Sequence, residues 1–182
     1  MRFACLLALA LVAAALVPSA TARQRRALRP VAADTIALAT VLERIAVHRD
    51  ETWRWQEVMH RSRTPYSRSV VRVRSLPYRK WVLKLWQRRA LAAKELAFNP
   101  PHKRDWLCIH RYEGSWKDAN APYYGGLQMD LAFQATYGPR LLHRKGTAEH
   151  WTPLEQMWVA ERAYRARGFW PWPNTAKFCG LI

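Results

Sequence analysis

Residues 111–128 read RYEGSWKDANAPYYGGLQ and place a single carboxylate, Glu113, among aromatic residues in a very basic chain. A segment rich in turn-forming residues follows this acid and ends near a Gly-Gly pair. Because glycine adopts positive φ without a steric penalty, we expect a turn or a short irregular hairpin over 120–128. Asp105 is placed to cap a helix over 106–112, which leaves Glu113 at the helix end. The stretch therefore predicts an acid at a helix C-terminus, followed by a turn.

The rest of the C-terminal part reads as short helices. A helix is predicted over 130–137, closed by a Gly-Pro pair. Thr152 followed by Pro153 and Glu155 is the pattern of a capping box and begins a helix that ends before Gly168. The tail, FWPWPNTAKFCGLI, is so rich in proline and aromatic residues that we expect it to be irregular.

The N-terminal region, residues 23–99, reads as basic and helical with a linker. We expect residues 23–30 to be disordered and residues 61–77 to be a loop. Between them, we expect a helix over 35–47 capped by Asp34 or Thr35, and residues 51–59 should extend or follow that helix. The clearest helix covers 78–98, and its periodicity predicts one apolar face formed by Trp81, Leu85, Ala92 and Leu96. We expect this helix to pack on the C-terminal part, with a membrane-surface helix as the alternative. The prolines after Asn99 end it and mark a domain boundary, so the C-terminal domain covers 100–182.

The N-terminus predicts export. Arg2 precedes the apolar run 3–17, and Ala20, Thr21 and Ala22 form an A-x-A site. These features indicate a secretory signal peptide over 1–22. The alternative, a membrane anchor, needs about 20 apolar residues. We therefore expect a secreted chain with no stable membrane span after cleavage.

Positive charge is concentrated in the first part of the mature chain. Residues 23–105 carry 20 Lys and Arg against seven acids, while 106–182 carry nine against six. An exported, basic and aromatic-rich protein is suited to an anionic surface such as cell-wall polymers, anionic lipid or nucleic acid. Export and the absence of a nucleic-acid-binding signature disfavour nucleic acid as a partner. A solvated basic face without a defined ligand is the alternative.

The mature chain would keep two cysteines, Cys108 and Cys179. Two cysteines in an exported protein indicate one disulfide, with two free buried thiols as the alternative. The bridge would hold the tail against the helix that precedes Glu113. No C-x-x-C or H-x-x-x-H spacing accompanies the cysteines, so we expect no metal site and no cofactor.

Four motifs follow one another from residue 106 to the end: EGSW (113–116), YYGGLQM (123–129), EQMWVAERAY (155–164) and a Trp-Pro at 172–173. Their order and spacing resemble the resuscitation-promoting-factor and transglycosylase-like group of the lysozyme-like superfamily. The resemblance does not extend to residues 23–99. It implies a mainly α fold of the α+β lysozyme-like kind, a small helical domain with a short irregular hairpin.

The resemblance also implies a cell-wall-associated enzyme that cleaves the MurNAc-GlcNAc bond of peptidoglycan glycan strands, with Glu113 as the general acid. By the same matching, the substrate-binding residues are Tyr124, Gly125, Gln128, Gln156 and Trp172. Gln156 corresponds to a family glutamine that faces the cleft. For Trp172 the alternative is a place in the core, and for Gln128 it is bracing of the hairpin.

The residue types fit this chemistry. Protonating a glycosidic oxygen near neutral pH requires a carboxyl group whose pKa is raised, and burial among apolar groups raises it. Tyr112, Trp116 and Tyr124 are available to form such surroundings for the acid. The family commonly has Glu-Ser-Gly-Gly-Asn-Trp where this chain has the shorter EGSW, so the alternative function is a non-catalytic lysozyme-like protein that binds the cell wall.

Most glycosidases use two carboxylates, but neither Asp118 nor Asp130 belongs to a recognisable second-acid motif. A lytic transglycosylase needs only one acid, because the muramic-acid 6-hydroxyl closes onto the anomeric carbon without an activated water. The sequence therefore favours transglycosylation over hydrolysis. Asp118 is expected to anchor the turn after Glu113.

Overall fold

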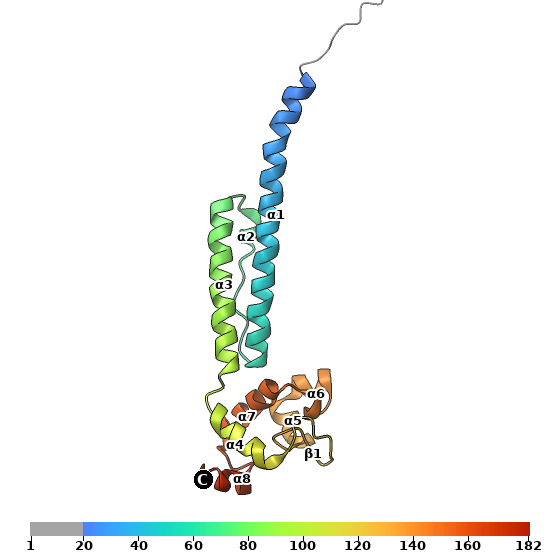
Figure 1. Ribbon diagram of the computed structural model, residues 1–182, viewed down its shortest axis with the longest axis vertical. Helices are drawn as coiled ribbons and strands as arrows, with labels where there is room; N and C mark the ends of the chain where they lie inside the picture. Colours follow the sequence, from blue (N-terminus) through green and yellow to red (C-terminus); the bar gives the residue numbers. More distant parts are fainter. Residues whose placement is uncertain (1–19) are drawn as a thin grey trace, which may run out of the picture.

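The computed structural model describes residues 20–182, with side chains from residue 34 onward, and is mainly helical. The apolar run 3–17 of the expected signal peptide lies outside the described residues. Figure 1 shows two parts, a long pair of helices and, at one end of it, a compact group of short helices. The chain passes from the first part to the second after residue 98.

The first part pairs α1 (Ala20–Val58) with α3 (Leu76–Phe98), and the two helices run in the same direction. The connecting segment returns along them and includes the short helix α2 (Ser69–Arg72). Arg79 is buried and donates hydrogen bonds to the carbonyls of Leu38 on α1 and of Val71 and Val73 in the connection. One guanidinium thus fastens the returning segment to both helices.

Several expectations for this part are wrong. The backbone is helical from Ala20, so residues 23–30 are not disordered and neither Asp34 nor Thr35 is a cap. Residues 51–59 were expected to extend or follow the helix over 35–47, and they extend it as far as Val58, consistent with the absence of glycine from α1.

The predicted apolar face of α3 is also wrong, because Trp81 is 57% and Leu96 49% exposed. α3 instead buries a stripe of larger side chains followed by alanines, Val82, Leu83, Trp86, Ala90, Ala93 and Ala97. The larger side chains pack against α1, while Ala93 and Ala97, near the end of α3, contact Trp158 of the C-terminal part. Since α3 is apolar on more than one side, its periodicity alone did not identify the face that its partner covers.

The C-terminal part consists of short elements in the order α4 (Lys103–Glu113), β1 (Tyr123–Tyr124), β2 (Met129–Asp130), α5 (Leu131–Tyr137), α6 (Pro139–Lys145), a 3-10 turn η1 (Ala148–His150), α7 (Pro153–Arg167) and α8 (Pro173–Phe178). β1 and β2 pair antiparallel, with Tyr123 opposite Asp130, so the short hairpin is confirmed. The capping box at Thr152 and Glu155 is confirmed too.

Two local expectations for this part fail. His102, not Asp105, is the N-cap residue of α4, and Asp105 lies in the first turn. The tail is not wholly irregular, because Pro173 begins α8 at a position where the missing proline N–H costs nothing.

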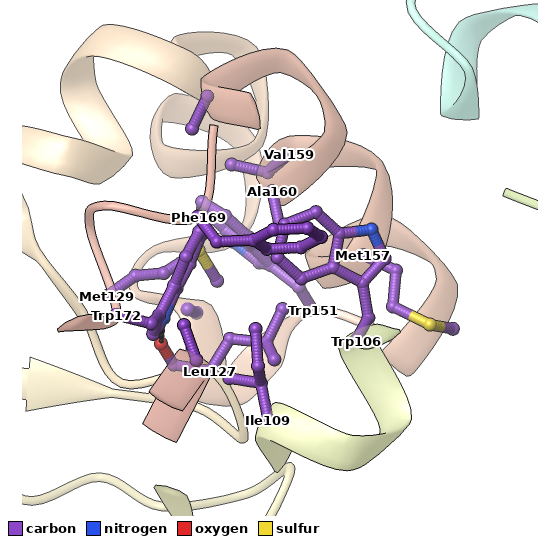
Figure 2. Close-up of a cluster of buried hydrophobic side chains, with 13 residues drawn as sticks. Trp106, Ile109, Leu127, Met129, Trp151, Met157, Val159, Ala160, Phe169 and Trp172 are labelled. Carbon is purple, nitrogen blue, oxygen red and sulfur yellow. Dashed lines mark hydrogen bonds between the residues drawn. The ribbon is translucent and has the colours of Figure 1, made fainter. Parts of the chain in front are cut away.

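The core of the C-terminal part is built around α7. Figure 2 shows Trp106 of α4 pointing into it towards Phe169 and Met157. Glu161 of α7 is only 2% exposed, and it accepts hydrogen bonds from the Trp106 indole N–H at 2.8 Å and the His102 backbone N–H at 2.8 Å. The buried carboxylate therefore anchors the start of α4 to α7.

The two parts meet where α3 ends. Trp158 of α7 is buried beside Met59, Ala93 and Ala97, and its indole N–H donates to the Ala97 carbonyl at 2.8 Å. This contact joins α7 to the end of α3.

We expect Trp158→Phe to lower the free energy of unfolding by about 1–2 kcal/mol, because it removes the indole donor and leaves the Ala97 carbonyl without that partner. Urea denaturation followed by fluorescence measures the change. The matched control is Trp170→Phe, at a side chain that is 66% exposed. Equal midpoints for the two variants would contradict a stabilising role for the Trp158 contact.

Candidate functional site

Glu113 is the last residue of α4, as expected. Gly114 follows with φ +136°, a conformation that L side chains rarely adopt, and its N–H closes the helix on the His110 carbonyl at 3.1 Å. The helix therefore ends where glycine permits it, and the Glu113 side chain is left half-buried at the helix terminus.

The Glu113 carboxylate has an asymmetric environment. The hydroxyl of Thr175, a buried residue of α8, donates to Glu113 Oε1 at 2.7 Å. No group among the described residues hydrogen-bonds the second oxygen, Oε2. One oxygen is therefore held in place while the other is left for an external group.

The disulfide Cys108–Cys179 is present, as the cysteine count predicted. Cys108 lies on α4, and Cys179 directly follows α8. The bridge and the Thr175–Glu113 hydrogen bond therefore join the same two helices. Thr175 is the site residue that sequence reasoning missed, because it lies in the tail that was expected to be irregular.

Asp118 anchors the turn after Glu113, as expected. Its Oδ1 accepts from the backbone N–H and the side-chain amide of Asn120, and its Oδ2 accepts from the Gln128 amide at 2.8 Å. Its backbone carbonyl accepts from the Gly125 N–H at 2.7 Å. Both carboxylate oxygens are thus used inside the turn, and Gln128 braces the hairpin.

Gln156 is fully buried, so the expectation that it faces the cleft is wrong. Its Oε1 accepts from the Gly126 N–H at 2.8 Å, and its Nε2 donates to the carbonyl of Trp116 at 2.9 Å. The same amide nitrogen also donates to the carbonyls of Ala148 and Trp151. Gln156 therefore positions the turn and the hairpin through buried hydrogen bonds, and its side chain is not accessible to a ligand.

Gly125 is required by two features of this arrangement. Its φ is +72°, and a Cβ atom there would lie 2.5 Å from Gln156 Oε1. The glycine thus lets the hairpin backbone approach the buried glutamine.

The aromatic residues expected around Glu113 make ring contacts elsewhere. Trp116 stacks on His110 with a centroid distance of 3.9 Å, and Tyr112 contacts Phe178 at 5.6 Å. Tyr124 is half-buried against the core of the C-terminal part. Among the described residues, the hydrogen bond that the Glu113 carboxylate makes is with Thr175.

A groove of about 340 Å³ lies between the hairpin, α5 and the segment after α7. It is lined by Tyr123, Gln128, Asp130, Phe133, Arg167 and Trp172, among others. Glu113 is not among the lining residues. The Thr175 hydroxyl that donates to Glu113 also lies 3.4 Å from the carbonyl oxygen of Trp172, a residue of the groove lining. The acid is thus linked to the groove wall through Thr175.

Two residues of the groove lining also make hydrogen bonds that stabilise the fold. Trp172 is 4% exposed, and its indole N–H donates to the Leu127 carbonyl at 2.7 Å, which is the core placement considered as its alternative. Asp130 caps α5 by accepting from the Phe133 N–H at 2.7 Å. The most exposed aromatic ring in the groove lining is Tyr123, at 50%.

No family model, curated protein or solved structure matches the chain. Within residues 34–182, no group of three or more His, Cys, Asp or Glu side chains is arranged to hold a metal ion. In the described part of the chain, no helix combines the length and the apolar character needed to cross a membrane. The function must therefore be argued from the chemistry of the site.

Proposed function

We propose that the protein is a secreted enzyme that cleaves the MurNAc-GlcNAc bond of peptidoglycan glycan strands, with Glu113 as the general acid. The observation that carries this proposal is the asymmetric environment of Glu113, with Oε1 held by Thr175 and Oε2 without a partner among the described residues. A general acid needs a fixed carboxyl group with one oxygen directed at the substrate. The four motifs that resemble lysozyme-like transglycosylases support the same assignment.

In this reaction Glu113 gives its proton to the glycosidic oxygen as the bond from that oxygen to the anomeric carbon of MurNAc breaks. The 6-hydroxyl of the same sugar then attacks the anomeric carbon and forms a 1,6-anhydro ring. The hydroxyl proton passes to the Glu113 carboxylate, which restores the acid. A single carboxylate suffices, and this is consistent with both oxygens of Asp118 being used in the turn.

The groove whose wall is linked to Glu113 through Thr175 and Trp172 is the proposed substrate site. The exposed ring of Tyr123 provides an apolar face on which a sugar ring can stack, and Phe133 contributes further apolar surface. Arg167 adds a positive charge in the same groove, which suits the carboxylates of peptidoglycan stem peptides. The basic surface of α1 and α3 is the proposed means of holding the anionic cell wall.

The role of Thr175 provides a graded test. We expect Thr175→Val to lower kcat by about tenfold to a hundredfold with little change in KM. The hydrogen bond from Thr175 strengthens as Glu113 loses its proton in the transition state, and a hydrogen bond to a charged group contributes about 1.5–3 kcal/mol. Thr175→Ser keeps the hydroxyl and should retain most of the activity. The rate at which soluble fragments are released from purified peptidoglycan measures the activity of both variants. Equal activities of Thr175→Val and Thr175→Ser would contradict a role of the Thr175 hydroxyl in positioning Glu113.

A further inference from the structure

A second cavity, of about 370 Å³, lies between the C-terminal end of α1 and the helices α6 and α7. In Figure 1, α6 lies below the end of α1, on the side of the C-terminal part that faces the helix pair. The cavity shares no lining residue with the proposed substrate groove. Its lining is strongly basic, with the cationic or titratable side chains Arg54, His60, Arg140, Arg144, Lys145 and Arg162.

The two carboxylates that line the cavity are already neutralised. Glu57 pairs with Arg144 at 2.7 Å, and Glu155 pairs with Lys145 at 2.7 Å. Among the described residues, no carboxylate pairs with Arg54, Arg140 or Arg162. Three guanidinium groups therefore line this space without a carboxylate partner among the described residues, and Arg54 lies over the Trp55 ring, 4.6 Å from its centroid.

Arg162 is the most enclosed of the three. Its Nε donates to the Tyr137 carbonyl, and no hydrogen bond is made by its terminal nitrogens within residues 34–182. Burial lowers the pKa of Arg162 to about 10, with a further contribution from Arg165, so the group stays charged at neutral pH. An enclosed charge without a counter-ion is costly, and an anion in the cavity would remove that cost.

The pKa of His60 is affected by the same positive charges. The pKa of its imidazole is lowered, first by burial and then by the positive charges of Arg162, Arg140 and Arg165. His60 also lines an adjoining hollow together with Arg61, Arg63 and Arg140. The basic surface thus continues outward from the cavity.

We propose that this cavity binds a phosphate group, held by the guanidinium groups of Arg140 and Arg162 with Arg54 and His60 beside it. The planar fork of arginine matches the oxygens of phosphate. Three guanidinium groups exceed the single charge of one carboxylate or one phosphodiester group, and this favours either a phosphate dianion or several phosphodiester groups of one chain. The outward continuation of the basic surface suits a phosphodiester chain as the source of that group.

Isothermal titration calorimetry at constant ionic strength tests the proposal, using inorganic phosphate and glycerophosphoglycerol, a soluble phosphodiester, as probes. We expect saturable binding of at least one probe, and Arg140→Gln should weaken it by about tenfold or more. The Arg140 side chain is exposed and makes no hydrogen bond among the described residues, so this variant should fold normally. Arg88→Gln, at an exposed position on α3, removes the same charge and should leave the affinity unchanged.

Proton NMR of the His60 ring supplies an independent readout. Bound phosphate should raise the pKa of His60, since a nearby anion stabilises the imidazolium, and Arg140→Gln should reduce that rise. The proposal is overturned if neither probe binds saturably, or if Arg88→Gln weakens binding as much as Arg140→Gln. It is also overturned if succinate binds as tightly as phosphate. If binding occurs, the tighter of the two probes identifies free phosphate or a phosphodiester as the ligand.

Discussion

Glu113→Gln is expected to lower peptidoglycan cleavage by about a hundredfold to ten-thousandfold, the usual contribution of a general acid. Glutamine has nearly the same shape and keeps a carbonyl oxygen that can accept from the Thr175 hydroxyl, but it has no acidic proton to give. The melting temperature should therefore change little. Initial rates of fragment release, measured beside a thermal melt, separate loss of chemistry from loss of structure.

The matched control is Glu95→Gln, because Glu95 is exposed on α3 far from the groove. It removes the same negative charge and should leave the rate unchanged. A Glu113→Gln variant as active as Glu95→Gln would exclude Glu113 as the acid.

The second large effect is expected at the disulfide. Replacing Cys108 and Cys179 by serine opens a loop with a sequence separation of 71 residues. In the chain-entropy model a bridge over a loop of this size contributes about 4 kcal/mol to the free energy of unfolding. Because the bridge also joins α4 to α8, its loss should loosen the Thr175–Glu113 contact and lower activity as well.

Guanidinium denaturation of the oxidised protein and of the double Cys→Ser variant measures this loss. Wild-type protein treated with reductant should resemble the variant, while the variant itself should not respond to reductant. A wild-type unfolding midpoint that does not move on reduction would show that the bridge adds no stability.

Local features of the C-terminal part were predictable from the sequence because short segments determine them. The helix end at Glu113 depends on Gly114, and the start of α7 depends on Thr152 and Glu155. The hairpin depends on the positive φ of Gly125. The disulfide followed from counting cysteines in a chain expected to be exported.

Features that depend on distant partners were not predictable in the same way. α1 determines which face of α3 is buried, and the periodicity of α3 alone indicated another. The burial of Gln156 depends on carbonyls in the turn and in the loop before α7, neither of which is adjacent in sequence. The position of Thr175 next to Glu113 depends on α8, a helix that was not predicted because the tail is rich in proline.

The location of an anion site among the basic residues was also not predictable from the sequence. Composition indicated an anionic partner, but it did not locate a site. Arg140 and Arg162 belong to the less basic C-terminal part, and they face the cavity only because α6 and α7 pack under the end of α1. The proposed phosphate site thus arises from the contact between the two parts.

Mass spectrometry of the muropeptides released from purified peptidoglycan by the wild-type chain and by Glu113→Gln decides whether Glu113 is the general acid of a transglycosylase. We expect soluble muropeptides with 1,6-anhydro ends from the wild type and almost none from the variant. Products in equal amounts from both proteins, or from neither, would contradict this assignment.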